Sequence, residues 1–265
     1  MKLIDIGVNL MNSSFDKDRE QVIKAAAAAG VSPLVITGSS ERSSLDAAIF
    51  AGAYNAVHPG ALYTTAGVHP HEAKNYGKNT GELLRELVLE RGARAIGECG
   101  LDYNRDFSPR DAQRRCFVKQ LELAAELSVP LFLHERDAFS DFSIIIGEYS
   151  RAVPAMVVHC FTGNAAELEY YISLGSYIGI TGWICDERRG RHLRELVKLI
   201  PADRLLLETD GPYLLPRDLP VKVKNRRNES RYLPHIAETA ARCLGKEPDE
   251  LAKETFSNTK RFFGI

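Results

Sequence analysis

The sequence predicts an α/β fold of the TIM type, a (βα)₈ barrel in a single domain spanning residues 1–265. Short apolar segments alternate with helix-like segments along the whole chain. Successive apolar segments begin about two to three dozen residues apart, which is the length of a βα unit. The chain length of 265 residues also suits one such barrel. An open doubly wound sheet is the competing fold, but residues 5–10 lack the glycine-rich phosphate turn that it favours.

Eight β-branched or apolar segments are predicted to be strands, and each one ends in polar or glycine residues. They cover residues 3–8, 34–37, 62–68, 95–98, 131–134, 155–159, 177–180 and 205–209. Amphipathic segments lie between them, and their apolar residues follow helical spacing. The clearest of these predicted helices cover residues 16–29, 110–127 and 165–174. Strand and helix therefore alternate, as a barrel requires.

Composition restricts the class of protein. The chain is 45% hydrophobic and 26% charged, which is ordinary for a globular enzyme with a sizeable core. Its net charge of -1 argues against a protein that coats nucleic acid by bulk electrostatics. A polyanionic ligand would therefore have to bind at a local basic patch.

The cysteines and the apolar segments indicate the compartment. The five cysteines are odd in number and form no C-x-x-C pair, so we expect free thiols in a reducing environment. The first twelve residues lack the apolar run of a signal peptide, and no segment approaches the ~20 apolar residues of a membrane span. We expect a cytoplasmic protein without a membrane association. No segment predicts an obligate protein partner.

Polar residues at the ends of four predicted strands are the strongest candidates for a functional site. They are Glu98, His134, His159 and Asp210. In a βα barrel the carboxyl ends of all strands meet at one rim, so these side chains are expected to lie together. Nitrogen and oxygen donors without a thiolate suit Mg²⁺, Mn²⁺ or Zn²⁺. The alternative, in which ordinary hydrogen bonds satisfy each side chain, would require four coincidences on one face.

Further polar residues near this rim are candidates for catalysis. Asp210 could orient a water molecule or accept its proton, beside a cation held by Glu98 and the two histidines. His69, after the third strand, and Arg136, after the fifth, could stabilise negative charge on a phosphate. Alternatively, His69 and its neighbour His71 shape a loop, and Arg136 is a solvated charge.

The segment after the eighth strand is rich in positive charge. Its cationic residues are Arg217, Lys222, Lys224, Arg226, Arg227 and Arg231, and Tyr213 and Tyr232 flank them. We expect Lys222, Lys224, Arg226 and Arg227 to contact phosphates. An aromatic side chain such as Tyr213 can stack on unpaired bases. The alternative interpretation is a solvated loop with two tyrosines in the core.

Several sequence blocks resemble the TatD family of metal-dependent nucleases, which belongs to the amidohydrolase-like barrels. The blocks are GVHPH at 67–71, AIGECGLD at 95–102, His134 with RDA at 136–138, HCFTG at 159–163 and ETDGPY at 208–213. They occur in the family's order across almost the whole chain. The resemblance implies divalent-metal-dependent hydrolysis of phosphodiester bonds in DNA or RNA. For the bacterial branch it implies a 3′-to-5′ exonuclease acting on single strands, with Glu98, His134, His159 and Asp210 as metal ligands and Mg²⁺ as the expected ion.

One departure from the family pattern concerns the number of metal ions. Most members carry an H-x-H pair after the aspartate of the first strand, whereas this chain has Gly7 and Asn9 beyond Asp5. We therefore expect one tightly bound ion, and a second that binds weakly or only with substrate. Two other functions stay open: a small-molecule amidohydrolase or deaminase on the same barrel, and a nucleic-acid-binding protein with weakened catalysis.

Overall fold

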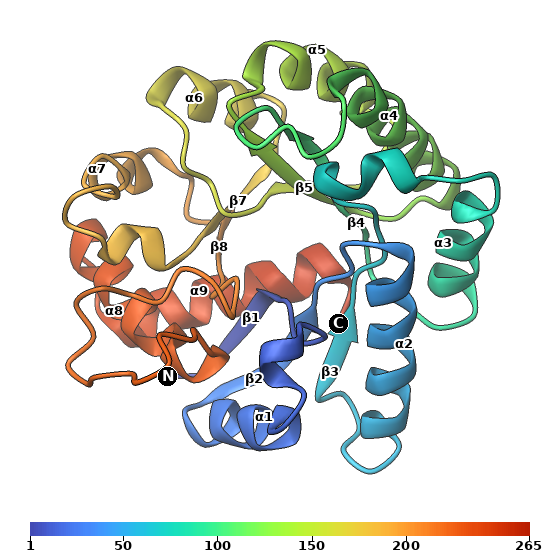
Figure 1. Ribbon diagram of the computed structural model, residues 1–265. Coiled ribbons are helices and arrows are strands. Elements are labelled where there is room, and N and C mark those ends of the chain that lie inside the picture. The colour runs from blue at the N-terminus through green and yellow to red at the C-terminus, as the bar shows by residue number, and fades with distance from the viewer.

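Eight strands alternate with helices in the computed structural model, which describes residues 1–265 (Figure 1). The strands gather at the centre of Figure 1 and the helices surround them. The strands are β1 (Leu3–Val8), β2 (Val31–Ile36), β3 (Leu62–Thr64), β4 (Ile96–Asp102), β5 (Leu131–Arg136), β6 (Met156–Val158), β7 (Tyr177–Ile180) and β8 (Leu205–Leu207). All of the predicted strand segments therefore contain a strand.

Helices follow the strands in the order that a βα barrel requires. The α-helices are α1 (Arg19–Ala28), α2 (Glu41–Asn55), α3 (Thr80–Leu89), α4 (Arg110–Leu127), α5 (Phe139–Tyr149), α6 (Ala165–Ser173), α7 (Leu193–Leu196), α8 (Leu233–Leu244) and α9 (Pro248–Phe263). The 3₁₀ helices are η1 (Ser13–Phe15), η2 (Pro70–Asn75), η3 (Gly182–Cys185), η4 (Val197–Leu199) and η5 (Ser230–Tyr232). None of the helices is both long and apolar enough to cross a membrane.

All neighbouring strands run parallel, and backbone contacts at two seams close the ring. Strands β1 to β3 form one sheet and strands β4 to β8 form another. Parallel bridges join Ala66 to Ile96 at one seam and Val8 to Gly211 at the other. At the second seam the Asp210 N–H donates to the Gly7 carbonyl at 2.9 Å. The predicted (βα)₈ barrel is therefore confirmed.

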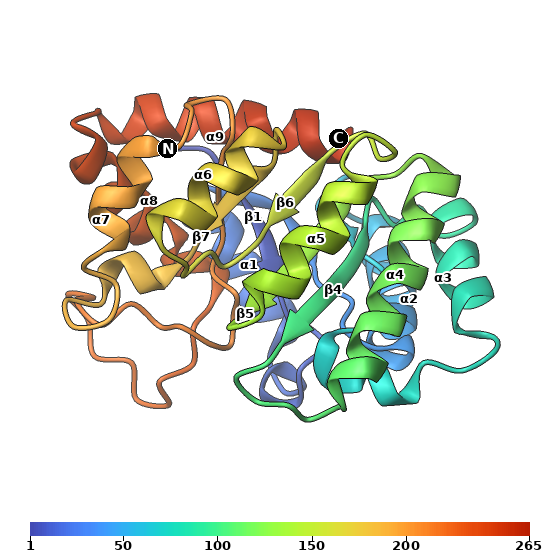
Figure 2. The same cartoon turned by 90° about the horizontal axis from the view of Figure 1, so that it is seen from above.

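The core divides into an inner and an outer layer. The inner cluster includes Ile6 of β1, Val35 of β2, Phe132 of β5 and Leu206 of β8, together with Phe262 of α9. The outer cluster of 53 buried residues fills the space between the strands and the helices. Figure 2 shows α9 and both chain termini at one end of the barrel, with the long loop after β8 at the opposite end. The rim that carries the candidate site is therefore free of α9.

Strand β4 is longer than the sequence predicted, because it continues to Asp102 instead of ending at Glu98. Gly97 and Gly100 have φ values of 138° and 148°. A Cβ atom on either glycine would collide with the β5 backbone, at the carbonyl of Phe132 or of His134. Glycine is needed for this close approach, and glycine inside a strand resembles a loop in sequence. Glu98 consequently lies within its strand rather than at its end.

Candidate metal centre

A single carboxylate oxygen lies among three imidazole rings at the barrel rim. Oε1 of Glu98 is 2.9 Å from Nε2 of His159, 3.0 Å from Nδ1 of His134 and 3.3 Å from Nε2 of His69. Glu98 belongs to β4 and His134 to β5, while His159 follows β6 and His69 precedes η2. Adjacent parallel strands thus deliver these groups to one point, as the sequence predicted for Glu98, His134 and His159.

Additional carboxylates lie behind two of the imidazoles. Glu208 Oε2 is 3.3 Å from Nδ1 of His159, and its Oε1 accepts the Cys160 N–H at 2.6 Å. Asp102 Oδ2 lies 3.5 Å from Nε2 of His134. A carboxylate behind an imidazole fixes the ring and makes its other nitrogen a better metal ligand. Asp102 was not selected from the sequence because the predicted strand ended at Glu98; its place as the last residue of the AIGECGLD block was the available signal.

The donor set fits a divalent cation. Nε2 of His134 is buried without a hydrogen-bond partner, although two carboxylates lie close to the ring. Burial raises the pKa of Glu98, but His69 and His159 outweigh that effect and hold the pKa well below its usual range. Burial lowers the pKa of His159, but Glu98 and Glu208 raise it well above its usual value. The buried carboxylate and the imidazole nitrogens around it therefore offer a cation a set of oxygen and nitrogen ligands.

His69 is better suited to donate a hydrogen bond than to bind a metal. Burial lowers its pKa to about 4, so the ring is neutral near pH 7. Nδ1 of His69 accepts the His71 N–H at 3.1 Å. The proton of the neutral ring must therefore be on Nε2, the nitrogen beside Glu98. His69 lies close enough to be grouped with the ligands, but this tautomer assigns it a different role.

Asp210 lies three residues beyond β8 and is positioned by Asn9. Nδ2 of Asn9 donates to Asp210 Oδ1 at 2.9 Å. Burial raises the pKa of Asp210 to about 8, and the nearby carboxylates of Glu98 and Glu208 act in the same direction. Asp210 forms no ion pair with His134 or His159. The protonated rings of these two histidines lower the pKa of Asp210 only through longer-range attraction. It therefore belongs to the same site without touching the Glu98 cluster directly.

Gly7 and Asn9 occupy the positions of the missing H-x-H pair. Glu208 explains why position 7 has no side chain. A Cβ atom on Gly7 would lie 2.5 Å from Glu208 Oε2 and 3.2 Å from Cζ of Phe132. Gly179 of β7 leaves room for the other carboxylate oxygen of Glu208 in the same way. Glu208 is completely buried. The space that a histidine at position 7 needs is thus filled by the carboxylate that orients His159.

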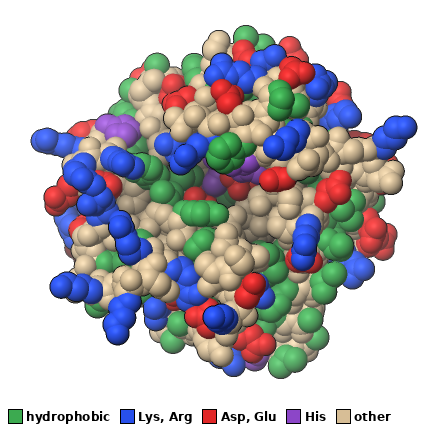
Figure 3. All heavy atoms as spheres, in the orientation of Figure 1, with side chains coloured by type: hydrophobic (Ala, Val, Ile, Leu, Met, Phe, Trp, Pro, Cys, Tyr) green, Lys and Arg blue, Asp and Glu red, His purple; other side chains and the backbone are tan.

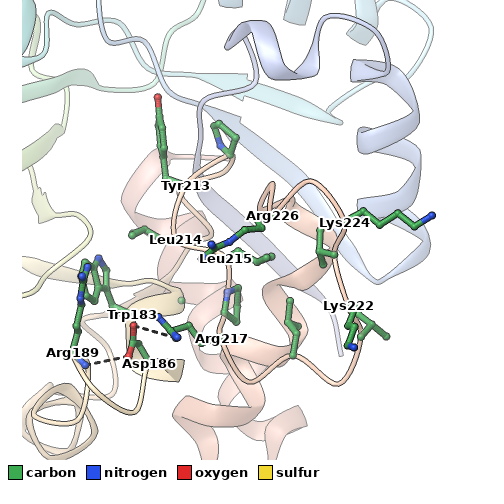
Figure 4. Close-up of a pocket in the computed structure, with 16 residues that line it drawn as sticks. Trp183, Asp186, Arg189, Tyr213, Leu214, Leu215, Arg217, Lys222, Lys224 and Arg226 are labelled. Atoms are coloured by element: carbon green, nitrogen blue, oxygen red, sulfur yellow. Dashed lines mark hydrogen bonds and ion pairs between the residues drawn. The ribbon is translucent and has the colours of Figure 1, made fainter.

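The basic loop, residues 212–229, borders a groove of about 740 Å³ beside this centre (Figure 4). Lys222, Lys224 and Arg226 line the groove, are exposed and have no ion-pair partner. Tyr213 is 53% exposed and also lines it, with its hydroxyl accepting a hydrogen bond from Asn12 at 3.3 Å. Figure 3 shows histidine in the central hollow of this face. Lys and Arg side chains are spread around that hollow.

Arg227 differs from its neighbours because its donors are already used inside the protein. Nε and Nη2 both donate to Glu229. Nη1 donates to the Ser14 carbonyl and to Asp18. Nη2 also donates to Asp18, at 2.6 Å. Its side chain is only 11% exposed. No N–H is left for a phosphate, so the expected contact between Arg227 and substrate does not fit this geometry. Arg227 instead fixes the loop to η1 and the start of α1.

Arg136 and the only tryptophan line a second groove that adjoins the first. The second groove has a volume of about 430 Å³ and includes Arg136, Thr162 and His192. Trp183 and Arg189 line both grooves, and the Arg189 guanidinium lies 5.8 Å from the Trp183 ring centroid. Arg136 is exposed and has no ion-pair partner. The sequence analysis missed Trp183, because nothing in its spacing connected it to the site.

Comparison with known proteins agrees with this arrangement. A family model described as TatD related DNase matches residues 4–264. A protein from Rahnella named "3'-5' ssDNA/RNA exonuclease TatD" is 50% identical over 263 residues, covering 99% of this chain and 98% of the relative. Its namesake from Escherichia coli is 48% identical, covering 99% of each chain.

Solved structures agree as well. A TatD family hydrolase from Entamoeba histolytica superimposes with a TM-score of 0.89 at 27% identity, covering 99% of this chain and 98% of the other. The Escherichia coli TatD homologue YJJV also gives 0.89, at 25% identity and the same coverage. The full-length match, the barrel and the histidine–carboxylate cluster agree with one another, and this chain belongs to the TatD-related DNase family.

Proposed function

We propose that this protein is a metal-dependent 3′-to-5′ exonuclease that hydrolyses phosphodiester bonds of single-stranded DNA or RNA. The observation that carries the proposal is the Glu98 cluster beside a groove lined by Lys222, Lys224 and Arg226, which have no ion-pair partner in the protein. The polarity and the substrate follow the names of relatives at 50% and 48% identity.

Glu98, His134, His159 and Asp210 would hold the cation, for which we propose Mg²⁺, with Mn²⁺ or Zn²⁺ as alternatives. When bound, a divalent ion lowers the pKa of a water molecule and offsets negative charge on a phosphate. His159 is prepared for this role because Glu208 accepts from its Nδ1 side and leaves Nε2 facing Glu98. The lack of an H-x-H pair supports one tight site rather than two.

We assign the remaining steps to three residues of the rim. Asp210 orients the attacking water or accepts its proton through a carboxylate whose Oδ1 atom is fixed by Asn9, and a bound cation would keep that carboxylate ionised. Nε2–H of His69 donates to a phosphate oxygen, since the neutral ring carries its proton there. The free guanidinium of Arg136 stabilises the charge of the same phosphate.

The groove provides a path for the rest of the strand. Lys222, Lys224 and Arg226 would contact backbone phosphates, which carry no sequence information. The exposed ring of Tyr213 and the partly buried ring of Trp183 would stack on bases of any sequence. Both features favour an enzyme that digests single strands with little sequence preference.

We also propose that residues 1–265 act as one hydrolase domain in the cytoplasm. The continuous core of 53 residues that joins strands to helices along the chain supports one domain. The five cysteines are all free, which suits a reducing compartment.

The test is release of mononucleotides from a single strand labelled at its 3′ or its 5′ end. We expect metal-dependent release of the 3′ label at the earliest times, late release of the 5′ label, and no release in EDTA. Tight binding of the strand without release in any divalent metal would indicate a binding protein. The absence of both binding and release would favour the amidohydrolase alternative.

A further inference from the structure

Three potential metal ligands lie together in a second cluster, which shares no residue with the Glu98 centre. Cys185 is the last residue of η3, Asp218 lies in the basic loop and His235 lies in the first turn of α8. One ligand atom from each lies within 4.8 Å of the other two. Nε2 of His235 is 2.6 Å from Oδ1 of Asp218. The proposed nuclease mechanism uses none of these residues.

The surroundings of this cluster contain an unsatisfied polar atom. Thr239 lies one helical turn after His235 on α8, so both side chains are on the same face. Its hydroxyl adjoins the Cys185 thiol. Thr239 is 3% exposed, and its Oγ1 atom has no hydrogen-bond partner. Because buried hydroxyls nearly always have a partner, this hydroxyl is free to hydrogen-bond a ligand that binds at the cluster.

We propose that Cys185, Asp218 and His235 form a Zn²⁺ site, with a water molecule next to Thr239 as the fourth ligand. A sulfur, a nitrogen and an oxygen donor suit Zn²⁺ and disfavour Mg²⁺, which prefers oxygen. Ligand atoms around one tetrahedral zinc ion lie about 3 to 4 Å apart. His235 and Asp218 would therefore separate slightly from 2.6 Å, and the pairs that lie up to 4.8 Å apart would approach by about 1 Å. On binding, the Cys185 S–H bond breaks, a sulfur–zinc bond forms and the proton passes to solvent.

The site would connect two segments that line the substrate groove. Asp186, Arg217 and Leu219 are chain neighbours of the ligands, and all three line the 740 Å³ groove. Figure 4 shows Arg217 directed toward Asp186, and their charged atoms are 3.9 Å apart. A zinc ion behind the groove lining formed by Asp186, Arg217 and Leu219 would join η3 and α8 to the basic loop. It would therefore order the loop that presents Lys222 and Lys224, without taking part in hydrolysis.

The test uses Co²⁺ as a spectroscopic substitute for Zn²⁺ in the full-length protein after treatment with EDTA. Thiolate coordination produces a ligand-to-metal charge-transfer band that nitrogen and oxygen ligands do not produce. We expect this band to rise to one equivalent in the wild type and to disappear in Cys185→Ser and His235→Gln. It should persist in Cys243→Ser, which removes a cysteine outside the cluster.

Two further variants separate this site from the catalytic one. Glu98→Ala should keep the charge-transfer band while it loses nuclease activity, so the zinc proposal can succeed or fail independently of the proposed function. Cys160→Ser is needed because Cys160 adjoins His159 at the catalytic centre. The proposal is overturned if the folded wild type shows no band with excess Co²⁺, or if the band survives Cys185→Ser and disappears in Cys160→Ser. In Cys185→Ser we expect KM for oligonucleotides to rise several-fold, with kcat nearly unchanged.

Discussion

Nε2 of His159 and Oε1 of Glu98 lie 2.9 Å apart, although 61 residues separate them in the chain. One side chain comes from within β4 and the other from the end of β6, so strand β5 and its His134 lie between them in the barrel. A cation bound between these groups would take both atoms as ligands. The first prediction follows from this contact.

Removing any of Glu98, His134 or His159 should abolish most nuclease activity. The single variants Glu98→Ala, His134→Ala and His159→Ala are each expected to lower turnover by orders of magnitude, because the remaining ligands cannot position the ion. The measurement is the rate of mononucleotide release, with circular dichroism to show that each variant folds. A folded His159→Ala protein with near-wild-type turnover would contradict the assigned metal centre.

Neutralising the three free cations of the basic loop should weaken substrate binding. When Lys222, Lys224 and Arg226 are neutralised together, we expect a higher KM for oligonucleotides. The slope of log affinity against log salt concentration should become shallower by about 0.7 per lost phosphate contact. The matched control replaces the exposed Lys2, Lys253 and Lys260, which lie near β1 and α9 at the other end of the barrel. Equal salt slopes in the two triple variants would show that the loop is merely solvated.

Replacing two adjacent arginines of the basic loop should change the free energy of unfolding by very different amounts. Arg227→Met is expected to lower the free energy of unfolding by about 3 kcal/mol, since the buried Glu229 keeps only Arg231 as an ion-pair partner and Asp18 loses its own. Arg226→Met should change it by about 0.5 kcal/mol or less, because Arg226 is exposed. Urea titration measures both. Similar values for the two variants would mean that the ion pair of Arg227 contributes little.

Gly7 should control metal affinity through Glu208. The wild type is expected to bind one ion tightly in equilibrium dialysis without substrate. Gly7→Ala should weaken that affinity about 10- to 100-fold, because the new methyl group displaces the carboxylate that orients His159.

The control for Gly7 is Gly52→Ala, since nothing lies within 4 Å of a Cβ at Gly52 in α2. That variant should bind metal normally and be slightly more stable. A histidine at position 7 would meet the same obstruction as alanine, so restoring the H-x-H pair is not expected to add a site. Two equally tight ions in the wild type would contradict the one-site expectation.

Asp5 should make stability depend on pH. Asp5 is fully buried and accepts hydrogen bonds from the Thr209 backbone and hydroxyl, and burial raises its pKa from 3.8 to about 6. Folding therefore favours the protonated form, and this stabilisation is complete below pH 3.8 and is lost as the pH rises through about 6. The change amounts to about 3 kcal/mol.

The measurement for Asp5 is the free energy of unfolding in EDTA between pH 4 and pH 7. Asp5→Asn should make the decline across this interval smaller by up to about 3 kcal/mol, whereas the part that comes from Asp210, whose pKa is also raised, should remain. Asp249→Asn should keep the whole decline, because the side chain of Asp249 is 76% exposed. An identical pH dependence in the wild type and Asp5→Asn would show that Asp5 does not titrate in this range.

The sequence by itself determined the order of the elements and the main ligands. The eight apolar segments fixed the strands, because a strand buried on both faces must be apolar along its length. Parallel strands separated by helices place their carboxyl ends at one rim, so Glu98, His134 and His159 could be grouped before any coordinates were known. The sequence blocks also identified the family and the expected chemistry.

Only the tertiary structure decided what surrounds those ligands. Contacts such as Glu208 with Gly7 or Arg227 with Asp18 join residues about 200 positions apart, and no local pattern encodes such a pairing. The same holds for the tautomer of His69, which a backbone N–H fixes, and for the place of Trp183 between two grooves. Strand periodicity specifies which way a side chain faces, whereas its partner depends on how distant strands and loops meet in the closed barrel.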